Sequence, residues 1–154
     1  MQNIRRQIVL SLSLMVSAGA GVTSVIQQRV WQADVQIRTL EVTKSRTGMS
    51  VRVVVYTEHD DDARDARLLI LLPVGVGVER LAAGCAASAG PSMVPSLRAT
   101  VACELGQIVD HGFREVILTT TLPPEGMPKR FGVFAYSGTP DPVPGNNYAE
   151  RTLR

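Results

Sequence analysis

The chain has 154 residues, of which 45% are hydrophobic and only 5% aromatic, and its formal net charge is +2. This length suits one domain with its own core, which must be built from Val, Leu, Ile and Ala. The charge comes from the first 20 residues, which contain Arg5 and Arg6 and no acidic residue, so that 14 basic and 14 acidic residues remain in the rest of the chain. A neutral domain has no basic surface for nucleic acid, which excludes that class of function.

The first 20 residues have the three parts of an export signal. Arg5 and Arg6 are followed by an apolar segment at residues 8–16, and then by Ala18 and Ala20 in an A-x-A pattern. The charges hold the start of the chain in the cytoplasm while a short apolar helix enters the translocon, and small residues fit the peptidase. We therefore predict a signal helix at residues 1–20 that is cleaved after Ala20, and a polar linker at residues 21–32.

Two other interpretations of this segment remain open. Weakly apolar sequence continues through residues 21–26, so the segment could be an uncleaved membrane anchor, or else a buried helix. A spanning helix needs about 20 predominantly apolar residues, and serine and glycine dilute this one. No cysteine follows the apolar segment, which argues against a lipid-modified anchor. The expected localisation is secreted or in the cell envelope, with membrane contact only through an uncleaved N-terminal segment.

From residue 33 onward, apolar and polar residues alternate with the period of two that is typical of strands, without helical periodicity. Polar or Gly- and Pro-rich segments separate the apolar ones, and residues 59–67 and 82–95 are predicted loops. The continuous apolar run at residues 68–72 predicts a central strand covered on both faces, and the charged last segment predicts an edge strand. The expected domain at 33–154 is an all-β antiparallel sandwich of about eight strands: residues 33–42, 49–58, 68–72, 78–81, 100–105, 114–122, 130–136 and 148–153.

The chain contains two cysteines, Cys85 and Cys103. In an oxidising compartment two cysteines most often pair, and a bridge that closes a loop of this length contributes about 3 kcal/mol to stability. Two free buried thiols are the alternative. A zinc site is disfavoured because His59 and His111 are the only histidines and no C-x-x-C spacing occurs.

An acidic run in the loop after residue 58 is the candidate for metal chemistry. Asp60, Asp61, Asp62 and Asp65 could supply oxygen ligands to a calcium ion, because hard cations bind several oxygens that converge from a loop. Arginines interrupt the run and no glutamate closes it, so a solvated charged hairpin is the default interpretation. No metal and no cofactor are therefore predicted.

Motifs of catalysis are missing from the sequence. It has no G-x-S-x-G nucleophile motif, and its Gly-Val-Gly-Val segment lacks the lysine of a phosphate-binding loop. Asp110 and His111 are adjacent, but such a pair beside a distant serine is no evidence for a catalytic triad. We therefore expect a protein that is not an enzyme.

Three segments together resemble a known domain. They are Leu-Pro-x-Gly-Val at residues 72–76, V-A-C-E-L-G-Q-I at residues 101–108, and D-P-x-P-x-N-N, formed by Asp141, Pro142, Pro144, Asn146 and Asn147. In order and spacing the chain resembles, as a single copy, the immunoglobulin-like repeat of bacterial and archaeal surface proteins called domain of unknown function eleven. The resemblance extends over residues 33–153 and implies an immunoglobulin-like β-sandwich of seven to eight strands.

The resemblance also implies a function without catalytic residues. It indicates an extracellular structural or adhesive module that binds a protein or a glycan at the cell surface. The alternatives are a subunit of an envelope assembly that pairs through strand edges, and a calcium-stabilised β-domain. The prolines and asparagines of the last motif have local physical roles in stiffening and turning the chain, so we expect them to determine the fold.

Overall fold

The computed structural model describes residues 30–58, 61–88, 99–127 and 129–153. The chain divides into two units, residues 1–31 and 32–154. In the first unit only Val30 and Trp31 are described, so the predicted signal helix with Ala18 and Ala20 lies outside the described residues. Asp60 lies outside them as well. Within the described part, no helix has the length and hydropathy needed to cross a membrane.

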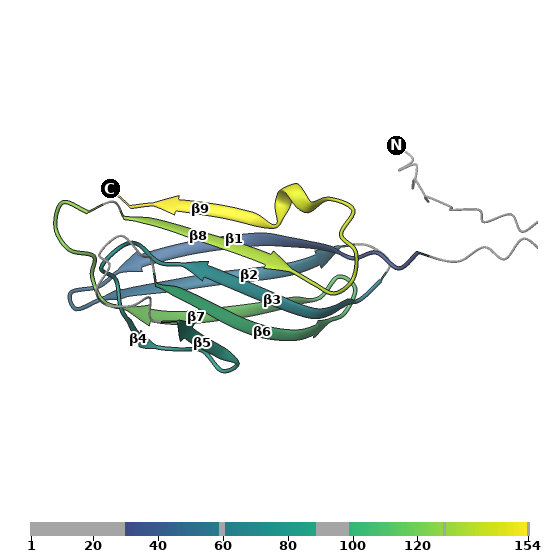
Figure 1. Cartoon of the computed structure of the whole chain (residues 1–154), viewed down its shortest axis with the longest axis horizontal. Coiled ribbons are helices and arrows are strands. Elements are labelled where there is room, and N and C mark those ends of the chain that lie inside the picture. Colours follow the sequence, from purple (N-terminus) through teal and green to yellow (C-terminus); the bar gives the residue numbers. More distant parts are fainter. Residues whose placement is uncertain (1–29, 59–60, 89–98, 128, 154) are drawn as a thin grey trace, which may run out of the picture. The chain divides into compact units, whose positions relative to one another are not determined.

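The second unit is an all-β domain of nine described strands and one short 3-10 helix, η1 (Figure 1). In chain order they are β1 (Asp34–Lys44), β2 (Met49–Glu58), β3 (Ala63–Leu71), β4 (Val78–Arg80), β5 (Cys85–Ser88), β6 (Thr100–Ile108), β7 (Phe113–Thr120), β8 (Arg130–Tyr136), η1 (Pro144–Asn146) and β9 (Tyr148–Thr152).

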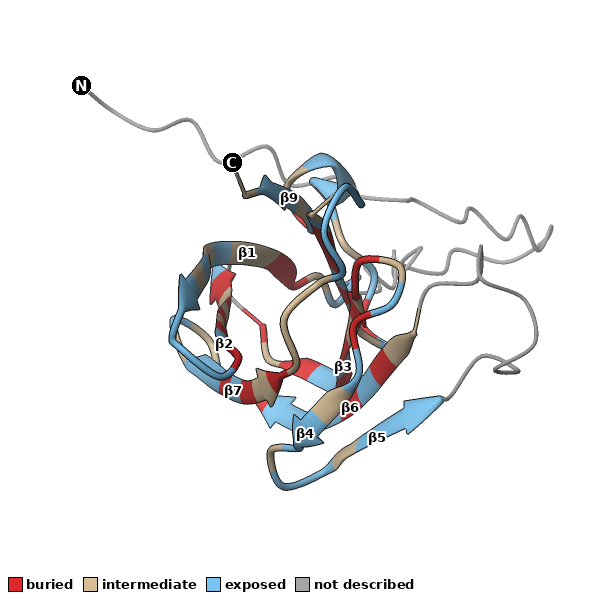
Figure 2. Ribbon diagram, turned by 90° about the vertical axis from the view of Figure 1, so that its left-hand side faces the viewer, coloured by how far each residue is buried: buried red, intermediate tan, exposed pale blue. Residues whose placement is uncertain are grey.

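The strands form two antiparallel sheets. One sheet has the order β1-β2-β7-β4 and the other has the order β5-β6-β3-β8-β9. Viewed from the end, the two sheets face each other and their buried residues line the space between them (Figure 2). The predicted antiparallel β-sandwich is therefore confirmed, with nine strands instead of about eight.

Period-two alternation builds the core, as expected for strands with one buried face. In β2, the side chains of Val51, Val53 and Val55 are fully buried, and the residues between them are half-buried or exposed. Val116 and Leu118 continue the same inner surface on β7. The opposite wall comes from β3, β6 and β8, so aliphatic side chains fill the interior, as the composition predicts.

The third strand begins five residues earlier than predicted. Residues 63–67 were expected to be a charged loop, but they belong to β3, where Ala63 and Ala66 are both buried. Two bulges explain this spacing: one adds a residue to β3 near Asp65, and the other adds a residue to β6 next to Gly106. Asp65 and Gly106 adopt positive φ angles of 50° and 69° there. The bulges offset each other, so the register beyond them is unchanged.

Other differences from the prediction are an added strand and several shifted strand ends. The expected loop at residues 82–95 contains β5, whose small exposed residues give no alternating signal. Strand β6 continues through Gly106 to Ile108 instead of ending at residue 105. By contrast, β3 lies at the centre of its sheet and β9 at an edge, as predicted. Only one face of β3 is fully buried, however, because Leu69 and Leu71 on its other face are half-buried.

Candidate functional site

Two aspartates tie together the connections at one end of the sandwich, which we call the polar end, where β2, β6 and β8 finish. The carboxylate of Asp61 is buried and accepts a hydrogen bond from the backbone N–H of Gln32 at 3.0 Å. Asp62 accepts from the backbone N–H of Asp110 at 2.9 Å and from the side-chain amide of Gln107 at 2.5 Å. The acidic run is therefore a set of tethers between connections, and the expectation of a solvated hairpin is wrong for Asp61.

The acidic run does not assemble a cation site in the described residues. No group of three or more His, Cys, Asp or Glu side chains there could hold a metal ion. Asp65 lies within β3, beyond the loop, and Asp60 lies outside the described residues. Calcium takes six or more oxygen ligands, whereas Asp61 and Asp62 already accept hydrogen bonds from the protein.

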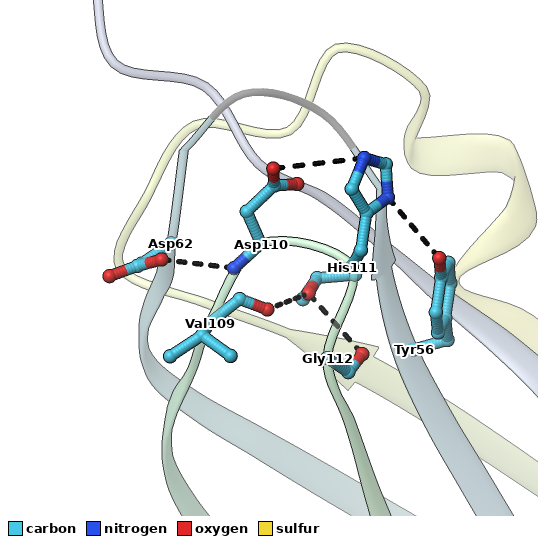
Figure 3. Close-up of polar contacts among 7 residues, drawn as sticks. Tyr56, Asp62, Val109, Asp110, His111 and Gly112 are labelled. Atoms are coloured by element: carbon cyan, nitrogen blue, oxygen red, sulfur yellow. Dashed lines mark hydrogen bonds and ion pairs between the residues drawn. The ribbon is translucent and has the colours of Figure 1, made fainter.

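Titratable side chains meet at the turn between β6 and β7 (Figure 3). His111 occupies this turn with a positive φ of 56°, and its Nδ1 lies 3.3 Å from the hydroxyl of Tyr56. Its Nε2 lies 3.7 Å from the carboxylate of Asp110. Beside them, the buried hydroxyl of Thr57 donates a hydrogen bond to the carbonyl of Val109 at 2.7 Å. The turn is thus held to the end of β2 by two side chains.

The geometry at His111 suits this structural role better than catalysis. The side chain of His111 is 64% exposed, so water screens its interaction with the carboxylate of Asp110. The distance to Asp110 exceeds that of a hydrogen bond, and the contact with Tyr56 is long for one. Within the described part, no serine or cysteine hydroxyl or thiol bonds to the ring, so the activated nucleophile of acyl transfer is not formed here.

The segment at residues 141–147 joins the β8–β9 connection to the first strand. Asp141 accepts three hydrogen bonds: from the backbone N–H of Val35 at 3.0 Å, from the backbone N–H of Val143 at 2.7 Å, and from the side-chain amide of Asn147 at 3.0 Å. Asn147 is itself buried, and its backbone carbonyl accepts a hydrogen bond from the backbone N–H of Ala135. These contacts lie within the fold, so they give Asp141 and Asn147 a structural role.

The remaining residues of this segment shape its path. Pro144 begins η1, and Pro142 precedes it. Asn146, at the end of η1, donates a hydrogen bond from its amide to the carboxylate of Asp34 at 2.9 Å. The segment thereby contacts the start of β1 at two points, through Asp141 and Asn146.

Cys85 and Cys103 form the predicted disulfide. The two residues are directly paired in the register of β5 and β6, and Cys103 points into the core with 2% exposure. The bond closes a separation of 18 residues. It attaches the short edge strand β5 to the sheet. Without the bond, only the pairing of four residues with β6 would hold β5.

A pocket of about 270 Å³ opens at the other end of the sandwich, between the β1–β2 hairpin and the β7–β8 connection. Its wall is apolar at Val42, Met49, Leu122, Pro123 and Leu153, and charged at Lys44, Glu125 and Lys129. Because charges of both signs line it, its electrostatics favour no class of ligand.

The aromatic side chains of the domain lie on its surface. The chain has three phenylalanines and three tyrosines, all in the described residues, and of these only Phe131 is buried. Four of the others are exposed, Phe113, Phe134, Tyr136 and Tyr148, and Tyr56 is half-buried. Aromatic rings gain more than most side chains from leaving water, so a domain that buries one of its six Phe and Tyr rings and exposes most of the others has candidate binding surfaces where those rings lie.

Three of these rings share the outward face of the five-stranded sheet. Phe134 and Tyr136 alternate with buried residues on β8, and Tyr148 pairs with Phe134 from β9. The rings of Phe134 and Tyr136 lie 5.8 Å apart, with 25° between their planes. We call Phe134, Tyr136 and Tyr148 the aromatic strip.

The other sheet has a smaller aromatic pair on its outward face. Tyr56 and Phe113 are directly opposite each other on β2 and β7. The guanidinium of Arg38 lies 4.3 Å from the centre of the Tyr56 ring, a cation–π contact. Further along the sheet, Arg52 contacts Glu115 at 2.5 Å, and this hydrogen bond raises the pKa of Arg52. Charged side chains therefore lie beside this aromatic pair on the same face, together with the exposed Ile117.

None of the six Phe and Tyr residues was singled out from the sequence. The alternation of Phe134 and Tyr136 with Val133 and Ala135 carries a usable signal, because it leaves two aromatic rings on the polar face of a strand. The position of Tyr148 depends on the pairing of β8 with β9, which the pattern of residues does not give.

The comparisons with known proteins assign no family. No protein-family model and no curated protein matches the chain. Among solved structures, it is similar to a GH20 exo-β-N-acetylglucosaminidase from Vibrio harveyi, as an inactive mutant and in complex with N-acetylglucosamine. In both cases the identity is 8%, the TM-score is 0.39, and the match covers 80% of this chain and 17% of the enzyme. Likeness at this level carries no argument about function.

Proposed function

We propose that this protein is an exported, non-catalytic interaction module that acts at the cell surface or in the cell envelope. One observation carries the proposal: five of the six Phe and Tyr side chains lie partly or fully on the surface of a disulfide-bonded sandwich. Aromatic side chains dominate the energy of binding surfaces, and they are costly to leave in water without a partner. The partner is a protein or a glycan outside the cytoplasm.

The disulfide supports the proposed compartment. Disulfides persist in secreted and envelope proteins and are rare in the reducing cytosol. The bond between Cys85 and Cys103 is compatible with the export signal expected at residues 1–20, with Ala18 and Ala20 at the cleavage site.

The strand order supports an immunoglobulin-like fold. In constant-type immunoglobulin domains, strands A, B, E and D form one sheet and strands C, F and G form the other. When β1, β2, β7 and β4 take the places of A, B, E and D, strands β3, β8 and β9 take those of C, F and G in the same chain order. The β5–β6 hairpin then extends the second sheet beside β3. This agreement also supports the resemblance to surface-protein repeats.

Intact mass tests the proposal, with native protein recovered from the envelope or the medium. We expect the mass of a chain that has lost residues 1–20, and an increase by two hydrogen atoms on reduction of the disulfide. A full-length mass with both thiols free would overturn export and the disulfide together. The same measurement on protein retained in the cytoplasm by deletion of residues 1–20 serves as the control, because its thiols should stay reduced.

A further inference from the structure

The aromatic strip has the properties of a carbohydrate-binding surface. This inference rests on the proposed function and specifies its partner. Phe134 and Tyr136 stand on one strand and Tyr148 on the next, and in each residue 40–47% of the surface is exposed. The half-buried Leu69 lies beside Phe134 in the register of β3 and β8, so the exposed rings continue into the apolar surface of the sheet.

The hydroxyl of Tyr148 reaches a glycine on the neighbouring strand. Its hydroxyl lies 3.5 Å from the point that a Cβ of Gly132 would occupy, and it donates a hydrogen bond to Glu150. The ring therefore extends along the sheet over Gly132, where there is no side chain to lift it. The hydrogen bond to Glu150 restricts the position of this ring, which lowers the entropy lost on binding.

Two ion pairs bracket the strip. At the Tyr136 end, Arg67 contacts Glu104 at 3.1 Å, and at the other end Arg130 pairs with Glu150. Arg67 lies opposite Tyr136 in the register, and contact with the Tyr136 hydroxyl and the charge of Glu104 raises the pKa of Arg67. Each guanidinium thus faces a carboxylate, and the four charged groups sum to zero.

This balance of charge distinguishes among possible partners. A single-stranded nucleic acid stacks on aromatic rings, but it also requires cations that are free to contact phosphate, and both arginines here are paired. An acidic polysaccharide has the same requirement. A neutral sugar does not: its C–H faces pack on the negative faces of aromatic rings, and its hydroxyls bond to carboxylate and guanidinium groups at the ring edges.

We infer that the outward face of the five-stranded sheet binds a neutral polysaccharide chain, which stacks on Phe134, Tyr136 and Tyr148 and bonds to the paired charges at both ends. The three rings are exposed and spread over two strands, so we expect them to bind several consecutive sugar units of a chain and not only its terminal unit. The other sheet face offers a built-in comparison, because Phe113 is exposed there beside a cation–π pair and several charged side chains.

Isothermal titration of the mature domain with cellohexaose, xylohexaose, mannohexaose and chitohexaose tests the inference. We expect one of these neutral probes to bind with an affinity that changes little between low and high salt. Phe134→Ala and Tyr136→Ala should each weaken this binding about tenfold or more, as the loss of a central aromatic contact does. Phe113→Ala is the matched control, because it removes an exposed phenylalanine from the opposite face, and this variant should bind as the wild type does. Circular dichroism checks that each variant is folded.

Four outcomes would overturn the inference. The wild type could bind none of the neutral probes, the strip variants could bind them unchanged, or binding could require an anionic polymer and disappear with salt. A protein partner whose cross-linking is abolished by Phe134→Ala would also overturn it, but would leave the proposed interaction module intact. The proposed function is tested separately by intact mass. It is wrong if the native protein keeps residues 1–20 and has both thiols reduced.

Discussion

The carboxylate of Asp141 accepts a hydrogen bond from the backbone N–H of Val35, a residue 106 positions earlier in the chain. Val35 belongs to the four-stranded sheet, and Asp141 lies in the connection between two strands of the other sheet. The backbone N–H of Ala33 donates to the carbonyl of Pro140 just beside it, at 3.1 Å. The two sheets are thus joined by polar contacts at the polar end as well as by the core between them.

Replacement of Asp141 tests how much this junction stabilises the fold. Asp141→Ala removes the acceptor of three hydrogen bonds and leaves the buried N–H of Val35 without a partner. We expect the free energy of unfolding, measured in urea, to fall by about 2–3 kcal/mol. Glu125→Ala, which removes an exposed carboxylate in the β7–β8 connection, is the control and should change it by less than about 0.5 kcal/mol. Equal effects of the two variants would contradict the assigned role.

The disulfide should contribute measurably to stability. The bond spans 18 residues, and the chain-entropy model gives about 3 kcal/mol for a loop of this size. We expect the double variant Cys85→Ala/Cys103→Ala to unfold at a lower urea concentration than the oxidised wild type. A reducing agent should destabilise the wild type and leave the double variant unaffected. If reduction has no effect on the wild type, the bond contributes nothing to the folded state.

The strands could be predicted where apolar residues follow a strict period of two. Residues 49–58 and 130–136 match β2 and β8 at both ends, because Val51, Val53 and Val55, or Phe131 and Val133, mark the buried face. The alternation within one strand does not indicate which strand pairs with it or in which register. The prediction therefore gives the strands and the sandwich, but not the order of strands in each sheet.

The prediction failed where a bulge or a neighbouring strand decides the structure. Ala63 and Ala66 are three positions apart and both buried, a spacing that only the bulge near Asp65 makes possible. Strand β5 consists of small exposed residues whose strand geometry comes from pairing with β6. Neither feature leaves a periodic signal in the sequence.

In the candidate site too, some features could be predicted from the sequence, whereas others depend on contacts between distant residues. Cys85 and Cys103 could be paired by count, because the chain has no other cysteine. The burial of Asp61 depends on the backbone N–H of Gln32, which lies 29 positions away. The types of residue in a sequence do not show which side chains contact a distant backbone group. The charged run was therefore predicted to be solvated. The aromatic strip is likewise completed by Tyr148 on another strand.

Calcium should not stabilise the domain. Asp61 and Asp62 accept hydrogen bonds from backbone and amide donors, and the described residues contain no group of three possible ligands. A bound ion at roughly a hundredfold excess over its Kd would add about 2.7 kcal/mol and raise the melting temperature by several degrees. We expect the melting curve in millimolar calcium to overlay the curve in EDTA. A clear upward shift would contradict the tether role of these aspartates.

Two buried threonines should respond oppositely to the same substitution. Thr57 and Thr120 are both fully buried on the inner face of the four-stranded sheet. The Thr57 hydroxyl donates to the carbonyl of Val109, whereas the Thr120 hydroxyl has no hydrogen-bond partner among the described residues. Replacement by valine keeps the shape and removes the hydroxyl. We expect Thr57→Val to lower the free energy of unfolding by about 1 kcal/mol, and Thr120→Val to leave it unchanged or raise it, because an unpaired hydroxyl no longer has to be buried. Urea unfolding of both variants measures the difference, and equal losses would show that the contact between Thr57 and the β6–β7 turn does not stabilise the domain.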